Sequence, residues 1–143
     1  EFINEENSEI GSTMIKRVGK FNYDANTHSL PKLRLNTFLN FEFNNILFGI
    51  NSRYIQGFSN KREIPTSVVA LGYSNKIKSF LVHDFSITKL FQSSLGEMQI
   101  GFGIINAFDK KAPLLYDAPD FSFDTRTHEP RGRLININAE LNF

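Results

Sequence analysis

The chain has 143 residues, of which 41% are hydrophobic and 22% are charged, and its 16 basic residues nearly balance 15 acidic ones. This length permits one domain, and the near-neutral charge gives no electrostatic footprint for nucleic acid. The absence of cysteine excludes disulfide frameworks, thiolate zinc sites and thiol nucleophiles. No apolar run approaches the roughly 18 residues of a membrane-spanning helix, whereas strands that cross a membrane alternate and need no such run.

Residues 1–32 show no steady alternation of polar and apolar side chains and are rich in Asn, Ser, Glu and Lys. We expect them to form mostly an outer loop, with one strand near residues 13–21. The amino terminus lacks the basic and apolar regions of a signal peptide.

Five later segments alternate apolar and polar side chains with a period of two, which predicts strands with one apolar face. The segments are residues 33–43, 46–58, 80–91, 97–108 and 135–143. Phe38 falls on the polar face of the first segment, and His83 and Lys89 fall on the apolar face of the third. Asn44-Asn45 separates the first two segments and suits a two-residue hairpin turn, because Asn tolerates positive φ.

Short and long connections alternate between these segments. Residues 44–45 and 92–96 form short links, whereas residues 59–79 and 109–132 form long ones. The longer segments run to about 11 to 13 residues, compared with about 5 to 6 for ordinary strands and about 9 to 11 for tilted membrane strands. This arrangement is typical of outer-membrane barrels, which have short periplasmic turns and long outer loops.

The alternation by itself leaves other classes of β-protein open. A soluble barrel shows the same period with its apolar face turned inward, so a soluble small-ligand-binding barrel is one alternative. Another outer-membrane barrel, such as a porin, is the second. Phenylalanines near the strand ends suit the aromatic girdles of a membrane barrel, although girdles usually contain Trp and Tyr.

Several motifs occur in a fixed order near the carboxy terminus. They are Asn106-Ala107-Phe108-Asp109-Lys110-Lys111-Ala112-Pro113, then Asp117-Ala118-Pro119, then Glu129-Pro130-Arg131-Gly132-Arg133, and a final alternating strand that ends in Phe143. This set resembles the carboxy terminus of TonB-dependent receptors, and Leu30-Pro31-Lys32-Leu33-Arg34 is similar to the segment that opens their fifth strand from the end. The resemblance covers roughly residues 18–143. Ala107, Ala112 and Glu129 depart from the family's usual Leu, Pro and Asp.

The resemblance implies an all-β fold, an antiparallel up-and-down meander of about five long strands. In the family this would be the carboxy-terminal segment of a 22-stranded transmembrane barrel. Residues 1–143 would form part of the barrel domain, with 1–32 mostly outer loop, 33–143 the last five strands, and the plug domain absent.

The function implied by the resemblance is energised uptake of a scarce nutrient, such as siderophore-bound iron, cobalamin or an oligosaccharide, across the bacterial outer membrane. The implied partners are the TonB complex of the inner membrane, which would act through the missing plug, the barrel-assembly machinery, outer-membrane lipid and a small nutrient ligand. No nucleic acid and no cofactor are implied.

The two long loops contain the residues that we expect to contact a ligand. These are Tyr73, Tyr116, Phe121, Phe123, Arg126 and His128. The resemblance also implies an assembly signal in the last strand, made of Ala139, Leu141 and Phe143. The motif residues have a purely structural alternative, in which Asp109 forms an Asx-turn and Arg131 and Arg133 pair with loop carboxylates.

No enzyme or metal site is predicted. His28, His83 and His128 are far apart in the sequence and show no metal-ligand spacing. His83 and Asp84 are adjacent on a predicted strand, so they point to opposite faces. Gly101-Phe102-Gly103 precedes no predicted helix, unlike a glycine-rich phosphate loop.

Overall fold

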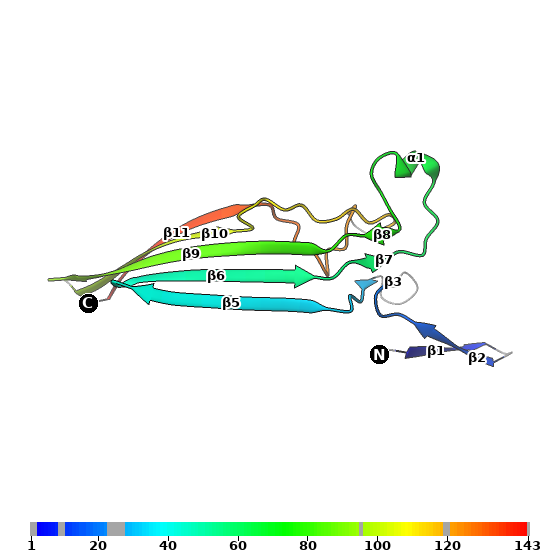
Figure 1. Ribbon diagram of the computed structural model, residues 1–143, viewed down its shortest axis with the longest axis horizontal. Coiled ribbons are helices and arrows are strands. Elements are labelled where there is room, and N and C mark those ends of the chain that lie inside the picture. The colour runs from blue at the N-terminus through cyan, green and yellow to red at the C-terminus, as the bar shows by residue number, and fades with distance from the viewer. Residues whose placement is uncertain (1–2, 9–10, 23–27, 95, 119–120, 143) are drawn as a thin grey trace. The chain divides into compact units, whose positions relative to one another are not determined.

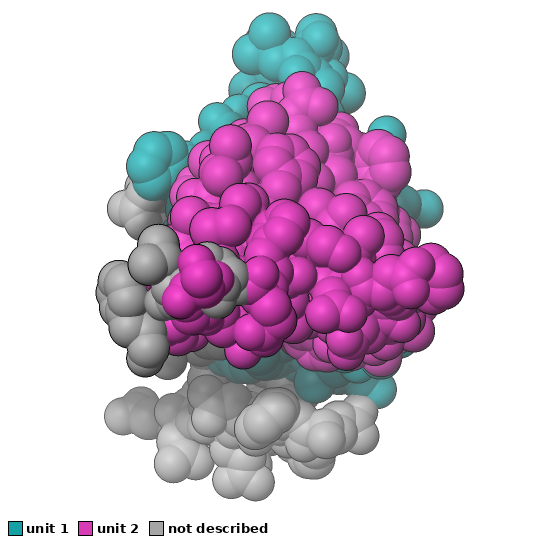
Figure 2. Space-filling model, turned by 90° about the vertical axis from the view of Figure 1, so that its left-hand side faces the viewer, with its two compact units in different colours: residues 1–34, 55–80, 112–130 teal, residues 35–54, 81–111, 131–143 magenta. Residues whose placement is uncertain are grey.

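The computed structural model describes residues 3–8, 11–22, 28–94, 96–118 and 121–142 (Figure 1). The chain divides into two compact units (Figure 2). Unit 1 consists of residues 1–34, 55–80 and 112–130, and unit 2 consists of residues 35–54, 81–111 and 131–143. Across the described residues, no helix is long and apolar enough to cross a membrane.

One antiparallel sheet of five strands, in the order β11-β10-β9-β6-β5, dominates the structure. Its strands are β5 (Arg34–Phe43), β6 (Ile46–Ile55), β9 (Phe80–Ser93), β10 (Gly96–Ile105) and β11 (Leu134–Asn142). The long strands neighbour one another in chain order (Figure 1). The prediction of an up-and-down meander of five long strands is therefore confirmed, and β5 and β11 are the two edges of an open sheet.

The pairing of the last three strands gives the sheet two different faces. Phe102 of β10 lies opposite Ile87 of β9 and Ile137 of β11, so these apolar side chains share one face. The next position along β10, Gly103, lies opposite Ser86 and Asn136 on the other face. The period-two pattern of the sequence thus sorts the side chains into an apolar face and a polar face.

The first predicted turn is confirmed. Asn44 and Asn45 have φ values of 50° and 59°, as both central residues of a type I′ hairpin turn require. The second link is shorter than predicted, because Gln92 pairs with Glu97 and β9 continues to Ser93.

The short turns lie at the same end of the sheet. β11 also runs to that end, since Asn142 pairs with Glu97 beside the second turn. Both long connections leave the sheet at the opposite end (Figure 1). The alternation of short and long links expected from the sequence is therefore present in the structure.

Two strand ends differ from the prediction. β10 stops at Ile105 and not at Phe108, because Asn106 has a φ of 51° and turns the chain out of the sheet. β6 stops at Ile55, and Phe58–Ser59 forms the separate strand β7. The alternation breaks at both points, because Ile55 and Ile105 stand at polar positions and Gln56 and Asn106 stand at apolar ones. Single exceptions such as Phe38 also occur inside a strand, so these breaks alone did not locate the ends.

Unit 1 holds short elements, most of which the sequence did not predict. Residues 1–32, expected to be mostly loop with one strand near residues 13–21, contain β1 (Ile3–Ser8), β2 (Gly11–Lys16), β3 (Phe21–Asn22) and β4 (His28–Ser29), and β2 covers the first part of the expected strand. The 59–79 connection contains α1 (Thr66–Val69) and β8 (Lys76–Ile77), and β8 pairs with β7. The two-residue strands have no measurable period, which is why the sequence pattern missed them.

The buried core lies in unit 1. Phe21, Phe58, Ile77 and Leu115 form its central cluster, and Ala118 packs against this cluster. Contacts among these buried side chains pack β3, β7, β8 and the 112–130 connection against one another. The apolar side chains of the five-stranded sheet are in a very different environment, as described next.

Candidate functional site

The apolar face of the five-stranded sheet is exposed in the described structure. Ile137 is 76% exposed, and many other large apolar side chains of this face are exposed too. They include Leu35, Leu39, Phe41, Phe43, Phe85, Ile87, Phe91, Ile100, Phe102, Ile135 and Leu141. A contiguous apolar surface of this kind marks contact with a membrane or with a protein partner.

Two ionisable residues interrupt this face near its ends. Lys89 pairs with Ile100, and its Nζ donates a hydrogen bond to the carbonyl oxygen of Asn44 over 2.7 Å. His83 lies six residues earlier on the same strand, with its Nδ1 2.7 Å from Oγ of Ser52 and its ring edge-on to Phe108. Both polar groups therefore have partners, and the face between them on β9 is apolar.

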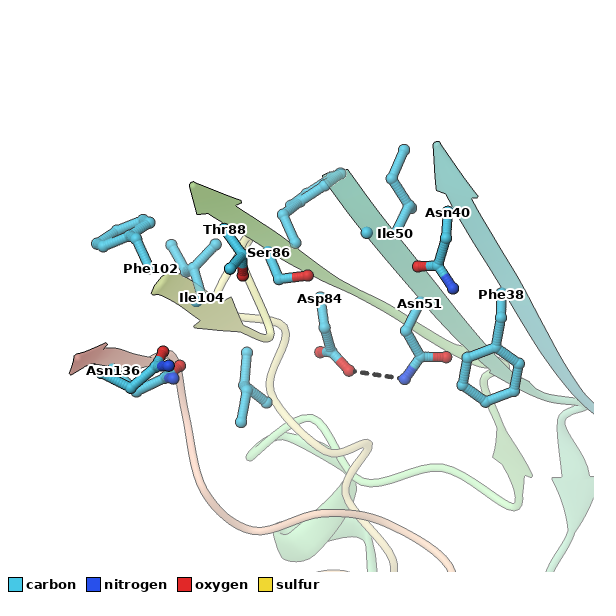
Figure 3. A pocket seen from close by; sticks show the side chains of 15 residues that line it. Phe38, Asn40, Ile50, Asn51, Asp84, Ser86, Thr88, Phe102, Ile104 and Asn136 are labelled. Carbon is cyan, nitrogen blue, oxygen red and sulfur yellow. Dashed lines mark hydrogen bonds between the residues drawn. The ribbon is translucent and has the colours of Figure 1, made fainter. Parts of the chain in front are cut away.

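The polar face contains a hollow of about 310 Å³ (Figure 3). Its polar lining comes from β5, β6, β9 and β11, namely Asn40, Asn51, Asp84, Ser86, Thr88, Asn136 and Asn138. Gly49 and Gly103 also line it and contribute no side chain. Phe38, the residue that broke the alternation of the first predicted strand, projects beside Asn51 and is 72% exposed.

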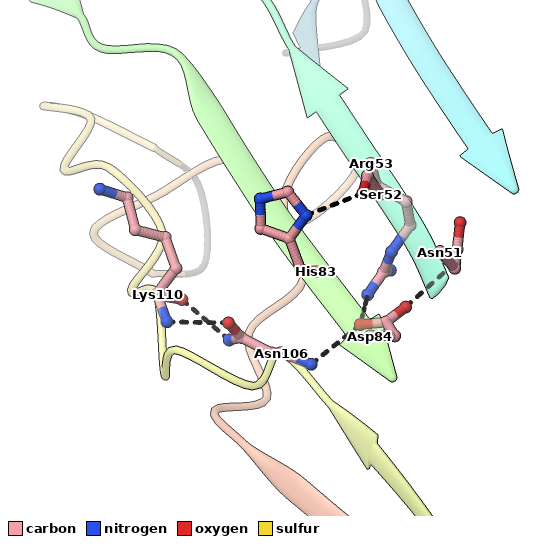
Figure 4. A network of polar contacts seen from close by, with 7 residues as sticks. All are labelled: Asn51, Ser52, Arg53, His83, Asp84, Asn106 and Lys110. Carbon is pink, nitrogen blue, oxygen red and sulfur yellow. Dashed lines mark hydrogen bonds and ion pairs between the residues drawn. The ribbon is translucent and has the colours of Figure 1, made fainter. Parts of the chain in front are cut away.

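Asp84 is the centre of a hydrogen-bond network at one end of this face (Figure 4). Its Oδ2 accepts a hydrogen bond from Nδ2 of Asn51 at 3.0 Å. Its Oδ1 accepts from the guanidinium of Arg53 at 3.2 Å and from the backbone N–H of Asn106 at 2.9 Å. The Asp84–Arg53 ion pair is partly buried, and the network links β6 and β9 to the end of β10.

The motif residues at the end of β10 form a turn closed by Asn106. The side-chain oxygen of Asn106 accepts a hydrogen bond from the backbone N–H of Lys110, and its Nδ2 donates to the Lys110 carbonyl. The residue predicted to form an Asx-turn was Asp109. The structure corrects this, because the side chain that closes the turn is that of Asn106.

Asp109 instead connects the two ends of the long 106–133 connection. Its Oδ1 accepts a hydrogen bond from the backbone N–H of Arg133 at 3.0 Å, and its carboxylate pairs with Lys111 at 3.0 Å. The hydrogen bond from Lys111, followed by that from the Arg133 amide, lowers the pKa of Asp109. A side chain at Gly132 would clash with the same carboxylate. The Arg133 guanidinium donates to the carbonyl oxygen of Ala107 at 3.4 Å, so the contact of Arg133 with Asp109 is a backbone hydrogen bond and not the predicted side-chain pairing.

The structure brings together four of the six residues predicted to contact a ligand. Tyr73, Tyr116 and Phe121 line one hollow of about 440 Å³ in unit 1. The two tyrosine rings meet edge to face with centroids 6.3 Å apart, and Phe123 stacks on Phe121 at 5.7 Å. These aromatic residues lie in two different connections of the chain, so their proximity is a result of the fold.

The other two predicted residues lie elsewhere. The backbone N–H of Arg126 donates to Oδ1 of Asp124 at 3.0 Å, and the Arg126 side chain is exposed. His128 is only 3% exposed, with its ring between Phe58 and Phe80. Burial lowers the pKa of His128 despite the nearby carboxylate of Asp124. Its position in the core is at odds with the predicted contact to a ligand.

Ser29, Asp124 and His128 are all buried in unit 1, which raises the question of acid–base chemistry. The backbone N–H of Ser29 donates to Oδ2 of Asp124 at 2.9 Å. Burial would raise the pKa of Asp124, but hydrogen bonds from Ser29, Thr127 and Arg126 lower it overall. Neither ring nitrogen of His128 has a hydrogen-bond partner among the described residues. The hydrogen bond between base and nucleophile that a catalytic triad needs is thus missing from this group.

The described residues also contain no group of three or more side chains able to hold a metal ion. Of the predicted assembly signal, Ala139 lies opposite Ile100 and Leu141 lies opposite Met98 in β10. Phe143 lies outside the described residues, as does Pro119 of the middle motif.

Sequence reasoning missed the Asp84 network and the bond between Asp109 and Arg133. Their partners are separated from them by 22 to 33 residues, and no local pattern reports contacts over such distances. No family model, curated protein or solved structure matches the chain.

Proposed function

We propose that the five-stranded sheet is part of the wall of an outer-membrane β-barrel, and that the barrel belongs to a TonB-dependent receptor. The observation that carries the proposal is the exposed apolar face of a sheet whose opposite face is polar. Burial in hydrocarbon would remove this apolar surface from water, at roughly 25 cal/mol for each Å². The polar face would then line the water-filled interior.

Strand length and connections support the membrane assignment. The strands contain 9 to 14 residues, whereas about 9 to 11 residues are needed to cross a bilayer at the usual tilt. The short turns would face the periplasm and the long connections the outside. Lys89, near the short-turn end, can keep its ammonium at the membrane surface while its stem lies along the apolar face.

The open edges of the sheet fit a larger barrel. β5 and β11 are edge strands, and unpaired backbone groups cannot face lipid. Further strands, paired with both edges, would close the wall. The 22-stranded barrel implied by the family resemblance is one architecture that satisfies this need.

The motif set supports the receptor family over other barrels. Asn106, Asp109, Gly132 and Arg133 come from two separate motifs, and their contacts hold the two ends of one outer connection together. The spacing of the motifs therefore has a physical reason. We accordingly propose energised uptake of siderophore-bound iron, cobalamin or an oligosaccharide, with the TonB complex, the barrel-assembly machinery and outer-membrane lipid as partners.

Cell fractionation of the native bacterium tests this proposal. Antibodies against the 143-residue chain should detect a protein in the outer-membrane fraction, and uptake of its nutrient should stop when the proton motive force is collapsed. A porin would give the same fractionation with uptake that needs no energy. Detection in an aqueous fraction would favour the soluble small-ligand-binding barrel and refute the proposal.

A further inference from the structure

We infer that the hollow on the polar face of the sheet binds a neutral saccharide, with Phe38 as its stacking platform. The inference rests on the proposed function, which encloses this face in the barrel interior and limits the ligand to three nutrient classes. Phe38 is the starting point, because it is an aromatic residue in the middle of a polar face. Neither the membrane assignment nor the polar network explains its presence there.

The Phe38 ring is free to receive a ligand. It is 72% exposed, and no ring pair in the described part of the chain includes it. The face of an aromatic ring carries partial negative charge, which attracts the weakly positive hydrogens of a C–H group. One face of a pyranose ring presents several such C–H groups at once. An exposed aromatic ring in a hollow lined by hydrogen-bonding groups can therefore contact both the C–H face and the hydroxyl groups of a sugar.

The polar groups that line the hollow match sugar hydroxyls in kind. Four amides and two hydroxyls line the hollow, from Asn40, Asn51, Asn136, Asn138, Ser86 and Thr88. An amide offers two donors and one acceptor, and a hydroxyl both donates and accepts. Asn51 is already oriented, because its Nδ2 donates to Asp84, while its Oδ1 is buried with no partner among the described residues. A ligand hydroxyl would satisfy this acceptor, which is costly to leave unbonded.

Charge favours a neutral ligand over an anionic one. Asp84 is the one ionisable residue in the lining, and its charge is offset by Arg53 at 3.2 Å. No Lys, Arg or His lines the hollow. An anionic iron chelate would thus meet no uncompensated positive charge there. The free-energy cost of removing water from its charge would then not be offset by an ion pair.

The size and floor of the hollow also suit a small ligand. Its volume of about 310 Å³ lies at the lower end of the usual range for ligand pockets. Gly49 and Gly103 contribute no side chain, and the side chains of Ser86 and Asn136 occupy the space that a Cβ would take there. These two polar side chains therefore lie close against the sheet at the floor of the hollow.

Saturation-transfer NMR on the full chain in a zwitterionic, sugar-free detergent tests the inference. The probes are neutral hexasaccharides of glucose, mannose, galactose and xylose. We expect at least one of these hexasaccharides to bind the wild-type chain. Phe38→Ala and Phe38→Leu should each weaken its affinity by about tenfold or more, whereas Phe38→Trp should leave the affinity unchanged. Phe41→Ala is the matched control, since Phe41 lies on the same strand with its ring on the apolar face against Phe48, and it should leave the affinity unchanged.

Three results would overturn the inference. The first is that no hexasaccharide binds, and the second is that the wild type and Phe38→Ala bind a hexasaccharide equally well. The third is that a ferric catecholate or an unstructured peptide, and not a sugar, binds at Phe38. Membrane location is tested separately by the cell fractionation of the native bacterium. Detection in the outer-membrane fraction together with no sugar binding refutes this inference alone, whereas sugar binding together with detection in an aqueous fraction refutes the membrane proposal.

Discussion

Oδ1 of Asp109 accepts a hydrogen bond from the backbone N–H of Arg133, 24 residues further along the chain, at 3.0 Å. Together with the hydrogen bond from the Arg133 guanidinium to the carbonyl oxygen of Ala107, this contact joins the turn after β10 to the residue before β11. Two motifs that are distant in sequence thus act as one structural unit, and their role can be tested without knowledge of any ligand.

Asp109→Ala should make the Arg133 amide exchange its hydrogen several times faster at pH 6, as followed by NMR. The lowered pKa of Asp109 means that the folded state binds fewer protons than the unfolded state, so the stabilisation is present above the ordinary pKa of 3.8. It is lost as the pH falls below 3.8 through the folded-state pKa. Asp117→Ala is the control, because Asp117 pairs with Arg62 in unit 1 and should not affect Arg133. Unchanged exchange in Asp109→Ala would contradict this role.

His128 should make unit 1 sensitive to mild acid. Its pKa is lowered by burial, so the stabilisation is complete above the ordinary value of 6.5 and falls as the pH drops below 6.5. Asp124 has a lowered pKa and titrates below 3.8, outside this pH range, and Arg34 is another charged group near His128. The protection factor of the Leu115 amide, which corrects for the slower intrinsic exchange at lower pH, should therefore fall between pH 7 and pH 5. His128→Phe should abolish this pH dependence, and its persistence in the variant would assign it to another group.

Leu115 should dominate the stability of the unit 1 core. Its side chain is 1% exposed, and Leu115→Ala should lower the free energy of unfolding by about 2 to 5 kcal/mol, because a cavity replaces buried methyl groups. Leu114 is 41% exposed, so Leu114→Ala should change this free energy by at most about 0.5 kcal/mol. Urea unfolding followed by tyrosine fluorescence compares the two variants. Equal effects would mean that Leu115 is not part of the core.

The two faces of β11 should tolerate charge differently. If Ile137 faces lipid, Ile137→Arg should lower the stability of the membrane-inserted chain by about 2 to 4 kcal/mol. Asn138→Arg places the same charge one residue away on the polar face and should cost less than about 1 kcal/mol. Urea titration of the closed barrel in lipid vesicles measures both. A similar loss from both substitutions would argue against a lipid-facing apolar face.

The sequence predicted the five long strands because their alternation is regular over many residues. The hairpin turn at Asn44-Asn45 was predictable for a local reason, the tolerance of Asn for positive φ. The end of β10 was predicted too late. The alternation breaks at Ile105 and Asn106, where the backbone turns, but it resumes at Phe108, and single exceptions such as Phe38 also occur inside strands.

The candidate sites were predictable to different degrees. Tyr73 and Tyr116 were selected as loop aromatics, and the fold places them in one hollow. His128 was selected on the same basis, yet packing against Phe58 and Phe80 buries it. Loop composition identifies residue types but not which of them point inward. Phe38 was visible in the sequence as a break in the pattern, and its neighbours on the polar face became known from the fold alone.

The central claim is that the apolar face of the sheet contacts lipid. Because the chain contains no cysteine, single cysteines can be placed along β11 from residue 135 to residue 141 and spin-labelled after the native outer-membrane protein has been reconstituted into vesicles as a closed barrel. We predict that labels at 135, 137, 139 and 141 collide with oxygen dissolved in the lipid, and that labels at 136, 138 and 140 collide with a water-soluble nickel complex. Equal access of the nickel complex to both sets would contradict the claim.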